Sequence, residues 1–240
     1  DVVDHIGLGR GTQLGLSVGI GLGQALEMPW FPRRLWADLL GRGEKSGIGM
    51  HGFFQGGLLY EAGKTKDDVL AQLSDRVAFP AQWRFVLVFS DIERGLSGAA
   101  EKSAFQREDP TPRELTSELS RLAEDVLLPA AAKGHFGQFS EALYRYGYLA
   151  GLCYRKTQNG RPYRTERLCA LVAMLRSVGV RGVGQTSWGP TIFALVSSER
   201  KARELCRAVE RIRARDAWSD LRCVISAPNN SGHRIEVVRH

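Results

Sequence analysis

The sequence predicts an α+β protein, and three patterns along the chain lead to this prediction. Arg84–Ser90 (RFVLVFS) is a continuous apolar run bounded by turn residues, which is typical of a buried strand. The last third of the chain alternates in the order helix–strand–strand–helix–strand, which favours a ferredoxin-like C-terminal half. Glycine-rich segments stand before several of these elements, where the backbone must turn sharply.

The amino-acid composition is that of an ordinary globular protein. The 240 residues are 43% hydrophobic and 25% charged with a net charge of +7, enough for one large domain or two small ones. Basic residues are spread along the chain without interleaved aromatics, and the densest run, residues 200–215, reads as a solvated helix face. We therefore expect small anionic substrates and no nucleic-acid partner.

No apolar run approaches the roughly 20 residues that cross a bilayer, so we expect no membrane partner. The four cysteines, at 153, 169, 206 and 223, match no zinc or CxxC spacing. We expect free thiols and a cytoplasmic protein. Because the chain opens at Asp1 directly before a glycine-rich motif, we also expect an N-terminal piece to be absent from it.

The first half of the chain predicts a mixture of helices and short strands. Residues 12–26 predict a helix that is small and apolar on most sides, and therefore buried. Residues 34–40 predict a short amphipathic helix ended by Gly41. Residues 51–54 and 57–61 predict two strands separated by a glycine-rich turn, and the strand Arg84–Ser90 follows.

The second half predicts longer elements. Helices are expected from near Glu101, over residues 113–132, and over residues 136–153, with a turn at Asn159 and Gly160. A helix over Glu166–Ser177 precedes strands at residues 179–184 and 191–196. A helix at residues 199–215 and a strand over Leu221–Ser226 complete the pattern.

The first candidate site is a glycine-rich segment that leads directly into a helix. Three glycines in five residues let backbone N–H groups turn toward one point, and the positive end of the helix adds to the field there. The alternative is a tight connection without a ligand. The candidate phosphate-binding residues are Gly7, Gly9, Arg10, Gly11, Thr12 and Gln13.

The second candidate segment, residues 41–49, places two cations and a hydroxyl among four glycines. Arg42, Lys45 and Ser46 suit phosphate oxygens. The alternative is a surface loop whose charges are only hydrated.

The third candidate segment, residues 182–191, reads GVGQTSWGPT and lies between two expected strands. Gln185 and Ser187 form its polar centre beside Trp188, whose indole could serve as a stacking platform for an aromatic ring. The alternative is a hairpin in which Trp188 packs into the core.

Glu101, near a helix start, is a candidate magnesium ligand or base. The alternative is a first-turn acid that the helix dipole favours. His5, His51 and His135 have no ligand spacing between them, so we expect structural or surface roles for them and no metal site built by the protein alone.

At these segments the chain resembles the beta-ribofuranosylaminobenzene 5′-phosphate synthases, a branch of the GHMP kinase superfamily. The matching stretches are HIGLGRGTQLGLSV, GRGEKSGIG with FFQGG after it, and GVGQTSWGPT. The resemblance implies a GHMP-kinase-like two-part fold: a ribosomal-protein-S5-like N-terminal half over residues 1–160 that lacks its first strands, and a ferredoxin-like half over residues 161–240. Arg10 departs from the family pattern, which has a small hydroxyl residue there.

The resemblance also implies an activity. The family joins phosphoribosyl pyrophosphate to 4-aminobenzoate or 4-hydroxybenzoate with loss of carbon dioxide, an early step of tetrahydromethanopterin biosynthesis. It implies that Lys45 helps stabilise the pyrophosphate, with magnesium as a candidate cofactor, that Gln185 and Ser187 orient the aromatic acid, and that Trp188 stacks on it. Glu101 completes the catalytic set.

Two other readings stay open from the sequence. In an ATP-dependent small-molecule kinase, the same first loop would hold ATP and Glu101 would serve the acceptor hydroxyl. In a non-catalytic phosphometabolite-binding protein, Arg10 would mark a lost activity. In each case the ligand is a small phosphorylated molecule, and a homodimer is a candidate assembly.

Overall fold

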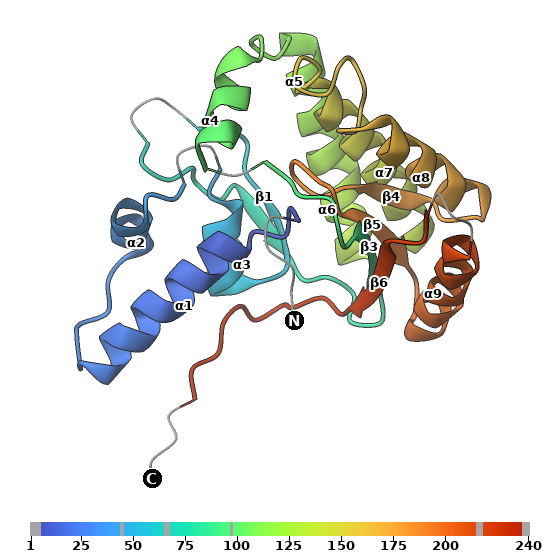
Figure 1. The fold of residues 1–240 in the computed structure, drawn as a ribbon. Helices are drawn as coiled ribbons and strands as arrows, with labels where there is room; N and C mark the ends of the chain where they lie inside the picture. The colour runs from blue at the N-terminus through green and yellow to red at the C-terminus, as the bar shows by residue number, and fades with distance from the viewer. Residues whose placement is uncertain (1–5, 44–45, 65–67, 97, 215–217, 237–240) are drawn as a thin grey trace. The chain divides into compact units, whose positions relative to one another are not determined.

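A computed structural model describes residues 6–43, 46–64, 68–96, 98–214 and 218–236 (Figure 1). The chain falls into two compact units. Unit 1 contains residues 1–8 and 80–228, and unit 2 contains residues 9–79 and 229–240.

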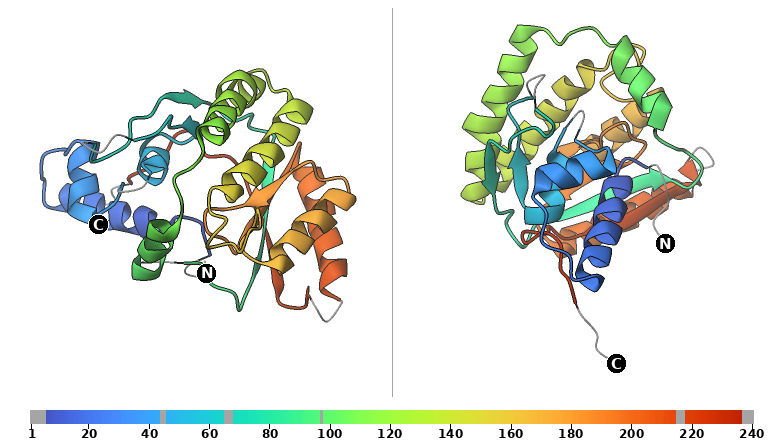
Figure 2. Two further views of the ribbon diagram at one scale, coloured as in Figure 1. Left: turned by 90° about the horizontal axis from the view of Figure 1, so that it is seen from above. Right: turned by 90° about the vertical axis from the view of Figure 1, so that its left-hand side faces the viewer.

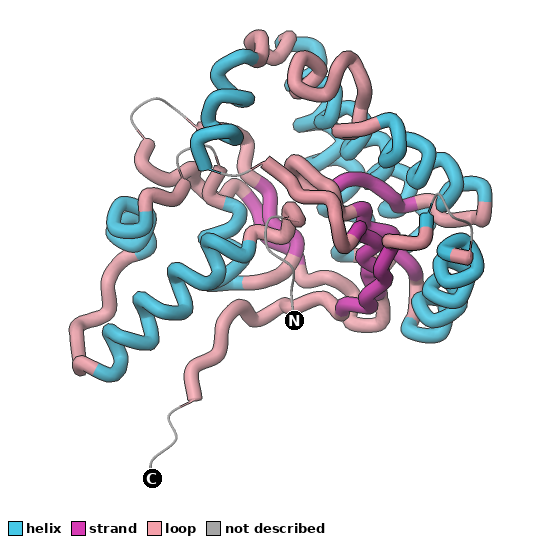
Figure 3. The backbone as a smooth tube through the Cα atoms, in the orientation of Figure 1, coloured by secondary structure: helices cyan, strands magenta, loops and turns pink. Residues whose placement is uncertain are grey.

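A four-stranded antiparallel sheet forms the centre of unit 1 (Figure 3). Its strands lie in the order β4-β5-β3-β6, and every neighbouring pair is antiparallel. With a helical crossover after β3 and another after β5, this is the ferredoxin-like order that the last third predicted. The strand bounds are β3 Arg84–Ser90, β4 Gly182–Gln185, β5 Ile192–Val196 and β6 Leu221–Ser226.

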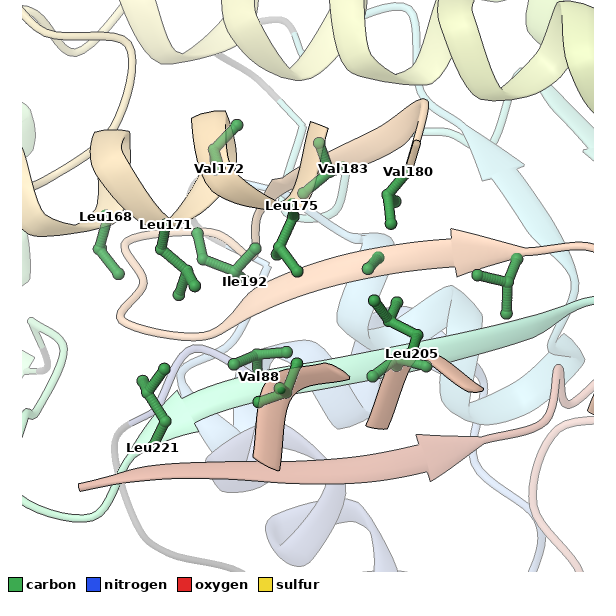
Figure 4. Close-up of a cluster of buried hydrophobic side chains, with 14 of the residues drawn as sticks. Val88, Leu168, Leu171, Val172, Leu175, Val180, Val183, Ile192, Leu205 and Leu221 are labelled. Atoms are coloured by element: carbon green, nitrogen blue, oxygen red, sulfur yellow. The ribbon is translucent and has the colours of Figure 1, made fainter. Parts of the chain in front are cut away.

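Helices cover both faces of this sheet. On one face, side chains of α8 (Glu166–Ser177) and α9 (Glu199–Arg213) share one buried cluster with the strands, including Leu171, Leu205 and Val88 (Figure 4). On the other face lies α7 (Phe136–Leu152): a methyl group at Gly182 of β4 would meet Cβ of Ser140 at 3.3 Å. The small residues of β4 therefore allow α7 to pack directly on the strand.

The helix predicted over residues 113–132 forms as one run with a change of pitch. It contains α5 (Arg113–Arg121), a π-helical segment over Leu122–Leu127, and α6 (Leu128–Ala132). The helix α7 returns along it after a short connection, as Figure 2 shows from two sides. The helix α4 (Gly98–Arg107) begins three residues before Glu101, near which the sequence predicts a helix start.

Unit 2 contains three helices and a two-stranded antiparallel sheet among its described residues. Leu16 and Ile20 of α1 pack with Trp36 of α2 and with Met50 and Phe53 of α3. The bounds are α1 Arg10–Ala25, α2 Arg33–Leu40, α3 Ile48–Gln55, β1 Leu58–Tyr60 and β2 Asp75–Val77.

Three expectations about local structure are wrong. Residues 51–54 form part of helix α3, because Met50 and Phe53, three residues apart, pack on α1 and α2. Helix α1 is not buried on most sides: Leu14, Val18 and Leu22 are each more than half exposed. Cys206 of α9 and Cys223 of β6 form a disulfide, whereas Cys153 and Cys169 are free as expected.

The two compact units divide the chain differently from the family-based division after residue 160. The strand β3, at residues 84–90, belongs to the same sheet as the three strands of the last third, because the crossover between β3 and β4 is long. The family-based division into domains at residue 160 stays a prediction. Among the helices described, none combines the length and the hydropathy that crossing a membrane requires.

Candidate functional site

The first predicted loop leads into the N-terminus of α1 in unit 2. Gly9 has a positive φ of 68° and ends the loop, and its carbonyl accepts the N–H groups of Thr12 and Gln13 at 3.1 and 3.2 Å. No side chain caps the helix, and its first turn carries no acid. The N–H groups of the first turn and the positive helix end therefore favour an anion.

The second predicted loop lies against this helix start. A methyl group at Gly11 would be 3.0 Å from Nη2 of Arg42, so the guanidinium stands over the first turn of α1. The amide of Gln13 donates to the carbonyl of Gly49 at 3.0 Å, and Thr12 lies close to Gly49. Unit 2 thus brings together the predicted residues Gly9, Gly11, Thr12, Gln13 and Arg42.

Ser46 has a different environment from the one expected of a phosphate ligand. Its hydroxyl donates to Glu61 at 2.9 Å and accepts the N–H of Ile48 at 3.2 Å. Both polar functions of the hydroxyl are therefore used within the protein. Lys45, predicted as a catalytic cation, lies outside the described residues, and Arg10 is exposed at the first position of α1.

Two buried ionisable groups stand behind Ser46. The carboxyl of Glu61 is 9% exposed and lies 3.7 Å from Nε2 of His51, whose side chain is 7% exposed. Burial raises the pKa of Glu61 above its usual range, and the hydrogen bond from Ser46 opposes that rise. Gly47 makes this approach possible, since a methyl group there would be 2.6 Å from Glu61 and 3.0 Å from His51.

The third predicted loop belongs to unit 1 and receives Gly7. With a φ of 82°, Gly7 lies so close that a methyl group would be 2.7 Å from the carbonyl oxygen of Thr186 and 2.8 Å from that of Gly189. The loop itself contains a positive φ at Ser187 and a cis peptide before Pro190. Gly7 and the third loop are thus side by side, as a common site requires.

Gln185 holds this loop to the segment that precedes α8. Its amide donates to Gln158 at 3.1 Å and to the carbonyl of Ser187 at 3.0 Å, and its oxygen accepts the N–H of Arg164 at 2.8 Å. Both amide hydrogens of Gln185 and one lone pair of its oxygen are therefore used within the protein, and its catalytic role stays a prediction.

Trp188 is in the packed position that was the alternative to a stacking platform. It is 4% exposed, and its ring lies 4.9 Å from Phe105 and 4.7 Å from Tyr154 between centroids. A benzoate would have to displace one of these neighbours to stack on the indole.

Glu101 lies in the first turn of α4, as predicted, and Phe105 follows one turn later on the same helix face. Since Phe105 contacts Trp188, α4 is fixed against the third loop within unit 1. Over the described part of the chain, no group of three or more His, Cys, Asp or Glu side chains is placed to hold a metal ion.

Sequence reasoning missed Glu61 and took His51 for a histidine without a special role. The available signal was an acid and a histidine on either side of the FFQGG stretch. Reading residues 51–54 as a strand concealed it, because a strand would not carry His51 toward Glu61.

Comparison with known proteins agrees with this fold. The family model "GHMP kinases C terminal" matches residues 127–214. The galactokinase of Lactococcus lactis, solved with galactose, is 16% identical with a TM-score of 0.59, over 96% of this chain and 68% of that one. A 4-(cytidine 5′-diphospho)-2C-methyl-D-erythritol kinase is 20% identical with a TM-score of 0.53, over 93% and 67%.

Curated relatives share more of the sequence. The beta-ribofuranosylphenol 5′-phosphate synthase of Methanothermobacter thermautotrophicus is 28% identical over 207 residues, and that of Archaeoglobus fulgidus is 29% identical over 245 residues. The first match spans 81% of this chain and 61% of the relative, and the second spans 97% and 73%.

Proposed function

We propose that this chain, which has the GHMP kinase fold and is related in sequence to the beta-ribofuranosylphenol 5′-phosphate synthases, is a phosphoribosyl-transferring enzyme of the same type. It would join the ribose of phosphoribosyl pyrophosphate to a 4-substituted benzoate, as an early step of tetrahydromethanopterin biosynthesis. The observation that carries the proposal is the similarity to the Archaeoglobus synthase over 97% of this chain.

The name of these relatives specifies a phenol as the product. An acceptor that yields a phenol on loss of its carboxyl group is 4-hydroxybenzoate, so we propose it as the first acceptor to test, with 4-aminobenzoate as the second. Either acceptor has an electron-donating group opposite the carboxylate, which makes the ring carbon that bears the carboxylate nucleophilic.

The proposed reaction breaks two bonds and forms one. The bond between ribose C1 and the diphosphate oxygen breaks, and the electron pair leaves with pyrophosphate. The ring carbon that bears the carboxylate bonds to C1, and the bond to the carboxylate then breaks to release carbon dioxide. The electron pair of that bond restores the aromatic ring.

Unit 2 supplies groups for the departing pyrophosphate. Negative charge grows on this leaving group in the transition state, where fixed N–H dipoles and cations are most effective. The N–H groups at the start of α1 and the guanidinium of Arg42 are fixed side by side and suit this task. Lys45 and Arg10 remain proposed as further cations for the pyrophosphate. Ser46 remains a proposed phosphate ligand, although its hydroxyl donates its hydrogen to Glu61 in this structure.

We propose that magnesium binds together with the donor, phosphoribosyl pyrophosphate. No described group of side chains can hold the ion alone, whereas the diphosphate supplies several hard oxygen ligands. Glu101 remains the proposed acid for the metal or the acceptor. Titration of activity with magnesium in the presence of EDTA tests the requirement.

We further propose a cytoplasmic homodimer. The disulfide between Cys206 and Cys223 is evidence against this compartment, because disulfides are rare in a reducing cytosol. A thiol count on protein isolated under alkylating conditions and a sedimentation measurement of mass test these two points. Two free thiols and a monomeric mass would contradict both.

The test of the reaction is release of labelled carbon dioxide from carboxyl-labelled 4-hydroxybenzoate by the full-length protein. We expect release that depends on phosphoribosyl pyrophosphate and is absent with ATP alone. Consumption of ATP with alcohols and no carbon dioxide would support the kinase reading instead. Binding of the donor without turnover would support a non-catalytic protein.

A matched pair of arginine variants tests the site. We expect Arg42→Ala to lower kcat/KM for the donor at least tenfold, because a charged contact to the leaving group is lost. Arg203→Ala, on the exposed face of α9, is the control and should stay within twofold of the parent. Equal activity of the two variants would contradict the role of Arg42.

A further inference from the structure

Lys64 is a partly buried cation of unit 2 whose ammonium group binds two backbone carbonyls. Its Nζ donates to the carbonyl oxygen of Gly43 at 2.9 Å and to that of Val69 at 3.0 Å. Gly43 lies 21 residues before Lys64 in the sequence, and Val69 lies 5 residues after it. One side chain therefore joins two stretches of backbone that the sequence separates.

The Val69 end of this bridge is anchored in the core of unit 2. Val69 and Leu70 pack, partly buried, against the cluster that α1, α2 and α3 form. The carboxyl of Glu61, which is 9% exposed, interacts electrostatically with Lys64. Two carbonyls and one carboxylate thus compensate the ammonium group for the water that it loses on partial burial.

The Gly43 end of the bridge belongs to the second predicted loop. Gly43 has a φ of 84°, and a methyl group there would be 2.8 Å from Cδ1 of Leu70, so the backbone contacts the core directly. Just before it, the N–H of Arg42 donates to the carbonyl of Ala37 at 2.9 Å, where α2 ends. Lys64 and the end of α2 therefore hold the backbone on the two sides of Arg42.

Arg42 is the cation that the proposed function assigns to the departing pyrophosphate. The residue is exposed, and its Nη2 would be 3.0 Å from a methyl group at Gly11 of α1. When the backbone of Arg42 is fixed, only rotations of its side chain remain to be ordered as an anion binds, so less entropy is lost. Groups that fix this backbone therefore strengthen anion binding without touching the anion.

We infer that Lys64 is a positioning residue for Arg42: its ammonium group fixes the carbonyl of Gly43, and with it the backbone from which Arg42 reaches the start of α1. Lys64 itself does not touch the diphosphate. The identity of the anion rests on the proposed function, whereas the contacts of Lys64 with Gly43 and Val69 are independent of any ligand.

The first experiment is a double-mutant cycle, read by calorimetric titration of the full-length protein with magnesium pyrophosphate. We expect Lys64→Met to weaken binding at least about fivefold in the parent but less than about twofold in an Arg42→Ala background, because a positioning residue acts only through the group that it positions. The matched control is Lys133→Met, at an exposed position in unit 1, which should stay within about twofold of the parent.

Two results of this cycle would overturn the inference. Equal weakening by Lys64→Met in the parent and in the Arg42→Ala background would make Lys64 an independent cation for the diphosphate. Binding by Lys64→Met that matches the parent would leave Arg42 without any need of Lys64.

A second measurement uses no ligand and separates positioning from a general loosening of unit 2. Amide hydrogen exchange is followed by NMR in the parent and in Lys64→Met. We expect the Arg42 N–H to exchange at least about fivefold faster in the variant. The N–H of Gly57, which donates to Asn229 at 2.7 Å within the same unit, should change less than about twofold. Unchanged exchange at Arg42, or equal acceleration at both amides, would contradict a positioning role.

These measurements distinguish the role of Lys64 from the proposed reaction. If the Arg42 amide responds and the cycle is non-additive, but the parent releases no carbon dioxide, the positioning role stands and the synthase reaction fails. If the parent does not bind pyrophosphate, the proposed use of Arg42 fails, and hydrogen exchange alone decides the role of Lys64. If carbon dioxide is released while Lys64→Met retains the parent KM for phosphoribosyl pyrophosphate, the reaction stands and the positioning role fails.

Discussion

Gly7 shows at the scale of a single residue how closely unit 1 is packed around its third loop. Its φ of 82° is in a region that side chains disfavour, and two carbonyl oxygens occupy the place of a methyl group. The residue was predicted as a phosphate-binding glycine, and its contacts give it a second role in fixing the loop of residues 186–189.

We expect Gly7→Ala to destabilise the protein by about 2–4 kcal/mol, from the disfavoured φ and the displacement of Thr186 and Gly189. The measurement is the free energy of unfolding in urea. Gly21→Ala is the matched control, because a methyl group at Gly21 of α1 meets nothing within 4 Å. That change should be neutral or stabilise by up to about 1 kcal/mol. Equal effects of the two variants would contradict the packing role of Gly7.

Residue types marked three glycine-rich segments as candidate sites, but they did not show which partner each side chain has. Gln185 and Ser46 are polar residues in such segments, and the side chains of both form hydrogen bonds with other residues of the protein. The partners that use them, Gln158 and Glu61, are more than ten residues away in the sequence. Their pairing depends on tertiary structure that a linear pattern does not contain.

At the scale of elements, Asp220 connects the start of β6 to α8 and β3. Its carboxylate accepts from Arg167 at 2.9 Å and also from Ser90. The hydrogen bonds from Arg167, more than any other contact, lower the pKa of Asp220 from 3.8 to about 2. Because this pKa is lower in the folded state, the carboxylate stabilises the fold above the unfolded pKa, and that contribution disappears as the pH falls from about 4 to about 2.

We therefore expect Asp220→Asn to lower the free energy of unfolding at pH 7 by roughly 2 kcal/mol. The stability curves of variant and parent should approach each other as the pH falls through about 2 and converge below it, where both side chains are neutral. Urea unfolding at several pH values measures this. The control, Asp38→Asn at an exposed position on α2, should follow the parent curve throughout. A constant difference between Asp220→Asn and parent down to pH 2 would rule out the carboxylate as its cause.

Elements with an unmistakable apolar pattern were predicted to the residue, and β3 is the clearest case. Its residues alternate between the buried face that packs with α8 and α9 and a half-buried face, so residues 85–89 are all apolar. The helix α3 was not predicted, because glycines at 47, 49 and 52 suggest turns. Packing of Met50 and Phe53 on α1 and α2 overrides that local preference.

At the scale of the whole molecule, the end of the chain belongs to unit 2. The carbonyl of Asn229 accepts the N–H of Gly57 at 2.7 Å, and the side chain of Asn230 bonds both the N–H and the carbonyl of Phe79. His233 stacks on Phe53 with ring centres 4.6 Å apart. Residues 229–233 thus complete the packing and hydrogen bonding of unit 2, most of which is formed by residues 9–79.

We expect Asn230→Ala to destabilise unit 2 by about 1–3 kcal/mol, since the change leaves the N–H and carbonyl of Phe79 without their partners. Hydrogen exchange measured by mass spectrometry should show faster exchange in peptides from residues 48–79 and unchanged exchange in β3 to β5. The control Glu236→Ala removes only an exposed ion pair with Arg234 and should change neither region. Uniform acceleration over both units would contradict a local role for Asn230.

The position of residues 229–233 has a consequence for synthesis of the protein on the ribosome. Residues 9–79 emerge before residues 80–228, yet the segment that completes their hydrogen bonds is translated only after all of residues 80–228. The nascent chain therefore holds an unfinished unit during the time in which unit 1 is made and begins to fold. Unit 2 is therefore completed only when residues 229–233 are made, and until then its apolar groups are exposed to aggregation.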